Sequence, residues 1–243
     1  PAPDEFPARI AQLLPEGGRR PFVVFAGTLT VGRGLERALD IIAEMAGEPL
    51  CFVFCGDGPG RAKLEATARE KNLLGTSIVF TGTVSRKELQ SILRSAIAAV
   101  ADCSPDARGG FLLDALAAAK PVILLGHGWQ RDLVEGRGAG VSLPMNAPAA
   151  AARELTDFLT DGDGLRRASQ QAAALAAGRF NLERICGEFR TLVQDIVDAD
   201  PREAVLRRRT LRAKRALDIT LSLAGLIVLS PVFVLVALAI WIK

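Results

Sequence analysis

Short apolar runs recur along the chain up to about residue 145, separated by longer segments of mixed polarity. Each run is four or five residues long and rich in Val, Ile, Phe and Ala, the pattern of a strand that is buried on both faces. Because helix-like segments follow these runs, the pattern predicts βαβ units and a parallel sheet with helices on both faces, a Rossmann-like α/β fold. The expected strands are residues 22–26, 51–55, 77–80, 97–101, 121–125 and 140–143.

Helical periodicity fills the gaps between the runs. Ser85 and Glu88 have the three-residue spacing of a capping box and start one of the helices. Residues 148–199 read as two or three further helices, with an alanine-rich stretch at 172–177 that is typical of close helix packing. In the first helical segment, apolar side chains repeat at three- and four-residue intervals at positions 35, 38, 39, 42 and 45.

The chain ends in a long apolar segment. Residues 219–241 contain no charged side chain and are long enough to cross a hydrocarbon core of roughly 30 Å as a helix. Ser230 and Pro231 interrupt this segment near its middle, where proline removes a helix hydrogen bond, so either a kinked spanning helix or a re-entrant helix fits. The preceding residues 202–215 carry seven basic side chains and one acid, which predicts a neck on the cytoplasmic side, against anionic lipid.

The net charge of +3 conceals an uneven distribution. The neck alone carries +6, so the first 201 residues sum to −3. A mildly acidic globule argues against nucleic-acid binding, which needs positive charge on the folded surface. The four cysteines lack the spacing of a zinc or redox site. Cys51 and Cys55 flank an expected strand, so we interpret these two as buried free thiols, which fits a reducing compartment.

These patterns predict a domain order. The chain opens without Met in a proline-rich stretch, and we expect the numbering to begin inside a longer protein. The expected parts are an interdomain linker at 1–19, a Rossmann-like domain at 20–147, C-terminal helices of the same domain at 148–200, the basic neck at 201–215 and a membrane helix at 216–243.

Two glycine-rich loops follow the first two expected strands. Residues 27–34 contain Arg33 and open a helix, so they are either a phosphate-binding loop or an ordinary turn with a solvated arginine. Residues 56–60 read Gly-Asp-Gly-Pro-Gly, which is not the dinucleotide fingerprint and disfavours a nicotinamide-linked dehydrogenase. A tight turn and a role near a ligand both remain open for this second loop.

A third loop follows the fourth strand and combines acids with glycines. Gly109 and Gly110 expose backbone N–H groups at a helix start, which suits a diphosphate, and Asp106 and Asp114 flank them. Carboxylates accept hydrogen bonds from vicinal hydroxyls of a sugar or a ribose, although solvated acids explain the same spacing. His127, the only histidine, follows the fifth strand as either a loop residue or a ligand contact.

In these loops the sequence resembles the C-terminal, donor-binding half of a family 4 glycosyltransferase of the GT-B fold. The likeness covers roughly residues 20–195 and consists of several short motifs in the family's order. Two acids with seven residues between them enclose a glycine, here Asp106, Gly109 and Asp114. The other matching segments are Gly27-Thr28 with Arg33-Gly34, Gly56 to Pro59, Phe80 to Val84 and Ala119 to Val122.

The resemblance implies roles for individual residues. Arg33 and the backbone from Gly109 to Leu112 would bind the donor diphosphate, and Asp106 the sugar hydroxyls, with Asp106 and Arg33 as catalytic residues. The similar enzymes retain configuration at the sugar and need no metal or other cofactor, and half of such a protein is not expected to turn over alone. The donor-binding set is Gly27, Thr28, Arg33, Thr83, Val84, Asp106, Gly109, Gly110, Phe111, Leu112 and Asp114, with Asp114 on the ribose and Thr83 and Val84 near the base.

Two departures from the family pattern keep an alternative open. Thr28 stands where the family has arginine, and both acids are aspartates rather than glutamates. A degenerate half that serves as a regulatory or dimerising platform therefore competes with an active transferase. A GT-B sugar epimerase is a third option, although it should not need the apolar tail.

The tail resembles the opening of a monotopic phosphoglycosyl transferase, which moves a sugar phosphate onto polyprenyl phosphate. Lys214 to Asp218, the apolar helix and Ser230-Pro231 carry this likeness over about 30 residues. It implies a bifunctional enzyme of polysaccharide biosynthesis at the cytoplasmic face of the inner membrane, with Mg²⁺ serving a catalytic part that would follow Lys243. The expected partners are a UDP- or GDP-sugar, a polyprenyl-phosphate-linked acceptor and anionic lipid, with a homodimer as a further option and no nucleic acid.

Overall fold

The chain divides into two units, Pro1–Asn181 and Leu182–Lys243, in a computed structural model. The structure describes residues 6–32, 34–103, 109–198, 214–215 and 217–222. All of its named strands lie in the first unit, together with every helix before α9.

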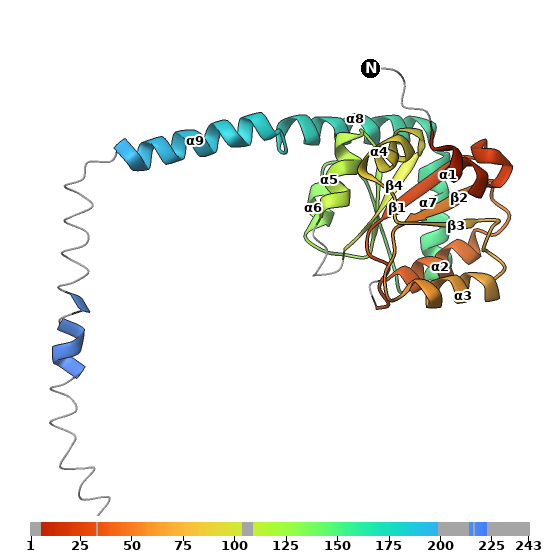
Figure 1. The fold of residues 1–243 in the computed structure, drawn as a ribbon, viewed down its shortest axis with the longest axis horizontal. Helices are drawn as coiled ribbons and strands as arrows, with labels where there is room; N and C mark the ends of the chain where they lie inside the picture. The colour runs from red at the N-terminus through yellow and green to blue at the C-terminus, as the bar shows by residue number, and fades with distance from the viewer. Residues whose placement is uncertain (1–5, 33, 104–108, 199–213, 216, 223–243) are drawn as a thin grey trace, which may run out of the picture. The chain divides into compact units, whose positions relative to one another are not determined.

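A single parallel sheet forms the centre of the first unit (Figure 1). Every strand begins within one residue of an apolar run that the sequence analysis identified, so the predicted sheet is confirmed. The strands pair in the order β3-β2-β1-β4-β5-β6, and all of the pairings are parallel. Their bounds are β1 Phe22–Ala26, β2 Cys51–Cys55, β3 Ile78–Gly82, β4 Ala98–Asp102, β5 Val122–Leu125 and β6 Gly140–Leu143.

Helices cover both faces of the sheet (Figure 1). Side chains of a strand alternate between the faces, so Val23 and Phe25 join the core under α2, α3 and α7, whereas Phe22 and Val24 join the core under α1, α4, α5, α6 and α8. The bounds of the helices are α1 Ala8–Leu13, α2 Leu35–Glu44, α3 Arg61–Glu70, α4 Arg86–Ser95, α5 Gly110–Ala117, α6 Gln130–Val134, α7 Pro148–Thr160 and α8 Gly162–Gly178, with a 3-10 helix, η1, at Pro15–Gly18.

The strand order reverses between β1 and β4. From β1 the chain proceeds through β2 to β3 on one side, then returns to place β4 on the other side of β1. In open parallel sheets ligands bind outside the carboxyl ends of the strands at this kind of switch point. The loops after β1 and β4 are therefore the first place to look for a site.

Part of the segment that we expected to link domains is folded into the first unit. Residues 8–13 form α1, and Ile10 on this helix is completely buried in the core. Arg9 donates a 2.7 Å hydrogen bond to Glu88 at the start of α4. Helix α1 therefore contributes to the core beneath α4 rather than serving as a free connection.

The prediction of buried free thiols is confirmed for Cys51 and Cys55, and a third cysteine is buried as well. Cys51, Cys55 and Cys103 are buried free thiols, and Cys186 is exposed. Burial raises the pKa of each buried thiol to about 11. These thiols are therefore protonated at neutral pH and serve as small apolar core residues.

The second unit begins with helix α9, Leu182–Asp198, and residues 214–215 and 217–222 are also helical. In the described part of the chain, no helix is both long and apolar enough to span a membrane. Most of the apolar segment that we expected to enter a membrane, including Ser230 and Pro231, lies outside the described residues.

Candidate functional site

The loop after β1 is held against the loop after β2. The backbone N–H of Gly27 donates to the carbonyl of Cys55 at 3.0 Å, and that of Leu29 donates to the carbonyl of Asp57 at 3.1 Å. Thr28 is exposed between them. The N–H of Gly32 donates to both carboxylate oxygens of Glu36, at 3.0 and 3.2 Å, so this loop amide already has an acceptor from its own helix. Arg33 lies outside the described residues.

The glycines of the loop after β2 make this contact between backbones sterically feasible. A Cβ on Gly56 would collide with the carbonyl oxygen of Gly27, and one on Gly58 would collide with that of Leu29. Gly60 is similarly close to the backbone of Val31, 2.7 Å from a Cβ to the amide nitrogen. Close packing therefore explains the Gly-Asp-Gly-Pro-Gly segment and supports the tight-turn interpretation.

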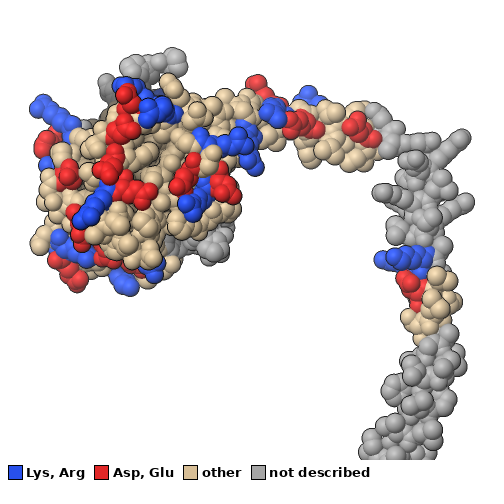
Figure 2. All heavy atoms as spheres, turned by 180° about the vertical axis from the view of Figure 1, so that it is seen from behind, with Lys and Arg blue, Asp and Glu red and all other residues tan. Residues whose placement is uncertain are grey.

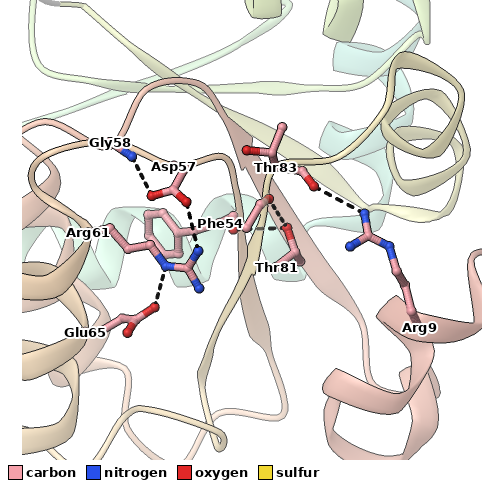
Figure 3. A network of polar contacts seen from close by, with 9 residues as sticks. Arg9, Phe54, Asp57, Gly58, Arg61, Glu65, Thr81 and Thr83 are labelled. Atoms are coloured by element: carbon pink, nitrogen blue, oxygen red, sulfur yellow. Dashed lines mark hydrogen bonds and ion pairs between the residues drawn. The ribbon is translucent and has the colours of Figure 1, made fainter.

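A chain of ion pairs closes this turn (Figure 3). Asp57 accepts a 2.8 Å hydrogen bond from the N–H of Gly58 and lies 3.3 Å from the Arg61 guanidinium. Arg61 also donates to Glu65 at 2.7 Å, one turn further along α3. The carboxylate of Asp57 is thereby used within its own loop and helix.

The end of β3 supplies Thr83 and Val84. The carbonyl of Thr83 accepts a 3.3 Å hydrogen bond from Arg9 of α1, while the Thr83 side chain is exposed (Figure 3). Val84 is half-buried against the core. Ser85 and Glu88 form the predicted capping box that starts α4, which fixes the direction in which the chain leaves β3.

Helix α5 begins at the switch point with little to cap it. Gly109 has φ +66°, a left-handed conformation that favours glycine, and no side chain caps the helix there among the described residues. Gly110 is exposed, whereas Leu112 is buried, so Leu112 offers a ligand only its backbone. Phe111 packs near Phe25 of β1, with ring centroids 6.4 Å apart.

Of the two candidate aspartates, Asp106 and Asp114, the structure describes only the second. Asp106 lies outside the described residues. Asp114 lies in the second turn of α5, is partly exposed and pairs with Arg86 of α4 at 3.6 Å. Arg86 is itself 81% exposed, and such solvent-exposed pairs are weak. The carboxylate of Asp114 is therefore accessible to a polar ligand.

The loop after β5 contains two side chains with distinct surroundings. His127 is exposed, and its Nδ1 lies 3.0 Å from the hydroxyl of buried Ser142, which donates at 2.6 Å to the carbonyl of Gly126. Trp129 is also exposed, and a Cβ on Gly109 would lie 3.6 Å from its ring. The loop after β5 therefore borders the start of α5.

Met145, after β6, connects this loop with the first one. A Cβ on Gly34 would lie 3.7 Å from the Met145 Cε, and a Cβ on Gly126 would lie 3.5 Å from its Cγ. The beginning of α2, the loop after β5 and the chain after β6 therefore meet at one edge of the sheet.

Sequence reasoning missed several of these partners. Nothing in the pattern indicated that Glu36 would bind Gly32 or that Arg86 would pair with Asp114, since both contacts depend on the direction in which a helix leaves its loop. Trp129 had a signal that could have been used, because it is a tryptophan in a glycine-rich loop directly after a predicted strand.

Charged side chains of both signs are interspersed over the face of the first unit seen in Figure 2. In the described residues no group of three or more His, Cys, Asp or Glu side chains could hold a metal ion. What the site does offer is backbone N–H groups at a helix start, an accessible carboxylate and an exposed indole.

Known proteins resemble this chain in sequence or in fold. A 2-deoxystreptamine glucosyltransferase of Streptomyces kanamyceticus is 31% identical over 121 residues, 49% of this chain and 30% of that enzyme. Among solved structures, Anabaena HepE in complex with UDP and glucose has a TM-score of 0.65 at 17% identity, covering 77% of this chain and 52% of that one.

A second solved structure corresponds to a single domain. The C-terminal domain of LpcC, a glycosyl transferase group 1 family protein from Francisella tularensis, has a TM-score of 0.58 at 17% identity and covers 72% of this chain and 94% of its own. This chain therefore spans about half or less of the longer relatives and nearly all of an isolated C-terminal domain. The family model "Glycosyl transferases group 1" matches residues 9–175, more than half of the sequence, and the chain belongs to that family.

Proposed function

We propose that this chain is the donor-binding half of a retaining glycosyltransferase that uses a UDP- or GDP-sugar. Membership of the glycosyl transferase family supports glycosyl transfer. Support for a nucleotide-sugar donor comes from HepE, a structural neighbour whose complex contains UDP. The relative that transfers glucose to 2-deoxystreptamine covers half of the chain, so it supports the reaction class rather than that acceptor.

The observation that carries the proposal is the start of α5. A helix N-terminus has unpaired N–H groups and a partial positive charge, which together bind phosphate without a cation. At α5 the left-handed Gly109 and the exposed Gly110 leave this end free of a side-chain cap among the described residues. The helix follows β4, next to the switch point between β1 and β4, where open parallel sheets bind ligands.

Asp114 would bind the ribose of the donor. Among the described residues its carboxylate has one ion pair, the weak and exposed pair with Arg86, and it can accept two hydrogen bonds from vicinal hydroxyls. Arg33 on the diphosphate and Asp106 on the sugar complete the proposed set by resemblance. Because the N–H of Gly32 is bound by Glu36, the first loop would contribute through its side chains rather than through this amide.

The acceptor and the cellular setting are proposed from the sequence beyond α9. The +6 neck and the apolar segment that follows it support an enzyme tethered at the cytoplasmic face of a membrane, joined to a phosphoglycosyl transferase. In such a fusion the membrane-bound product of one site is the acceptor of the other, a polyprenyl-diphosphate-linked sugar. Tethering raises the effective concentration of that intermediate.

Titration calorimetry tests the donor proposal. UDP, UDP-glucose, GDP and GDP-mannose are titrated into the full chain in detergent, and we expect one nucleotide series to bind. Asp114→Ala should weaken that binding by about tenfold, the effect of losing one or two hydrogen bonds to a charged group.

Asp157→Ala is the matched control. Asp157 is an exposed aspartate on α7 and lines a groove with Glu44 and Glu48, not the proposed site at the carboxyl ends of the strands. This variant should bind like the wild type. If no nucleotide or nucleotide sugar binds the wild-type chain, the proposal is wrong and a degenerate platform becomes the better explanation.

A further inference from the structure

Trp129 is the most exposed of the large apolar side chains described in the first unit, with 61% of its surface accessible. Tryptophan usually buries most of its surface, and packing does not explain this one. It lies in the β5–α6 loop, residues 126–129, at the edge of the sheet where ligands bind. An indole presented to solvent at such an edge indicates a ligand contact.

The indole lies beside the N-terminus of α5. A Cβ on Gly109 would lie 3.6 Å from both Cζ2 and Cη2, so the six-membered ring flanks the residue that starts the helix. If a donor diphosphate occupies that helix start, one of the two groups attached to it, the sugar or the nucleoside, lies next to this ring. Asp114, on the second turn of α5, marks the direction of the nucleoside in the proposed function, which leaves the sugar for the indole.

His127 is held in one orientation in the same loop. The Ser142 hydroxyl has a single proton, which it donates to the carbonyl of Gly126 at 2.6 Å. The 3.0 Å contact between Nδ1 of His127 and the Ser142 oxygen therefore requires Nδ1 to be the donor. In the neutral imidazole this leaves Nε2 as a hydrogen-bond acceptor on an exposed ring.

The β5–α6 loop packs close to the starts of both α2 and α5. Met145 lies against Gly126 and against Gly34 at the start of α2, and Trp129 lies against Gly109 at the start of α5. An exposed apolar ring and a fixed acceptor thus occupy one short loop beside two helix N-termini. This combination matches a pyranose, which has apolar C–H faces and a rim of hydroxyl donors.

We propose that the β5–α6 loop recognises the sugar of the donor: the Trp129 indole stacks on the face of the ring, and His127 Nε2 accepts a hydrogen bond from a sugar hydroxyl. The inference rests on the proposed function, because it assumes that a nucleotide diphosphate meets α5. The β5–α6 loop would then select between donor sugars, a selectivity that contacts with the nucleotide do not provide.

Tryptophan fluorescence reports on this contact directly. The chain has two tryptophans, Trp129 and Trp241, and no tyrosine, so Trp241→Phe leaves Trp129 as the sole strong emitter. In this background, UDP-glucose or GDP-mannose, whichever series binds, should quench or blue-shift the emission. The matching free diphosphate, UDP or GDP, should change it much less.

Affinities of variants separate sugar recognition from nucleotide binding. Trp129→Ala should weaken binding of the nucleotide sugar by about tenfold while leaving the free diphosphate within about twofold, and Trp129→Phe should recover most of the loss. His127→Ala should act in the same direction, and His127→Gln, which keeps an acceptor oxygen, should lose less. Leu13→Ala removes another exposed apolar side chain, on α1, and should change neither affinity.

The outcomes distinguish this inference from the function on which it rests. If free UDP or GDP binds but Trp129→Ala weakens the diphosphate and the nucleotide sugar equally, the indole contacts the nucleotide and the inference is wrong. Unchanged affinity for both ligands, or unchanged Trp129 emission on binding of the nucleotide sugar, would also overturn it. If neither diphosphate nor nucleotide sugar binds the wild type, the proposed function fails first and this inference with it.

Discussion

Ala119 adopts a backbone conformation that suits glycine. It has φ +54° and follows α5, where Ala119 N–H donates to Leu116 and Lys120 N–H donates to Ala115, the two hydrogen bonds of a Schellman motif. The left-handed conformation costs an alanine about 1–2 kcal/mol because its Cβ crowds the following carbonyl.

Ala119→Gly should therefore stabilise the first unit. Relief of the crowding outweighs the extra freedom of glycine in the unfolded chain, which costs about 0.4–1 kcal/mol, so we expect a net gain of about 0.5–1 kcal/mol. Chemical denaturation followed by circular dichroism measures this gain.

Ala118→Gly is the matched control. Ala118 has φ −82°, where alanine is unstrained, so glycine should destabilise the unit by roughly 0.5–1 kcal/mol. A loss of stability in Ala119→Gly as well would mean that the left-handed conformation carries no strain.

The glycines of the loop after β2 show what sequence can and cannot predict for single residues. The sequence indicated a turn there but left its purpose open. The reason for each glycine is a backbone contact with residues 27–31, which lie some thirty positions earlier in the chain. Whether a Cβ fits depends on that neighbour, and local sequence does not contain it.

At the level of elements, one ion pair connects α1 with the start of α4. Glu88 accepts hydrogen bonds from the Arg9 guanidinium at 2.7 Å and from the Ser85 N–H at 2.7 Å, which closes the capping box. These bonds lower the pKa of Glu88 to about 2, and the bond from Arg9 has the largest effect. The charged form of Glu88 is therefore favoured by folding.

Acid should remove this contribution. Because the pKa of Glu88 in the folded state lies below its ordinary value of 4.5, the stabilisation is complete above that pH and is lost as the pH falls from about 4.5 toward about 2. Glu88→Gln should lower the free energy of unfolding at pH 7 but reduce its further loss between pH 5 and pH 3. Urea denaturation at these three pH values provides the measurement.

Glu44→Gln controls for the loss of an exposed acid on another helix and should keep the acid sensitivity of the wild type. If Glu88→Gln keeps the full acid sensitivity as well, Glu88 does not titrate with folding.

Most elements were predictable because their signals are local. Apolar runs gave the strands, and the periodicity at positions 35–45 and the Ser85–Glu88 spacing gave helices that the structure contains. Helix α1 was missed because it has only six residues between prolines and one completely buried anchor, Ile10. Its contacts with the rest of the unit, Ile10 in the core and Arg9 with Glu88, are long-range, so local sequence does not reveal them.

At the scale of the whole molecule, the order of the strands is what sequence did not determine. The apolar runs predicted parallel pairing, but not that β1 would lie between β2 and β4. That order brings the ends of β1 and β4 together and makes the separate motifs after them parts of one site. Arg33, Asp106, Ser230 and Pro231 lie outside the described residues, so their roles stay predictions from sequence.

The central claim is that a nucleotide sugar binds where α5 begins. Hydrogen–deuterium exchange of the full chain, with and without UDP-glucose or GDP-mannose, tests this location most directly. We predict slower exchange of the amides of residues 110–113 with ligand, and unchanged exchange at residues 156–160 of α7, which lie beside the start of β1 at the opposite edge of the sheet. Ligand-induced protection confined to α7, or none at α5 with a ligand that calorimetry shows to bind, would contradict the claim.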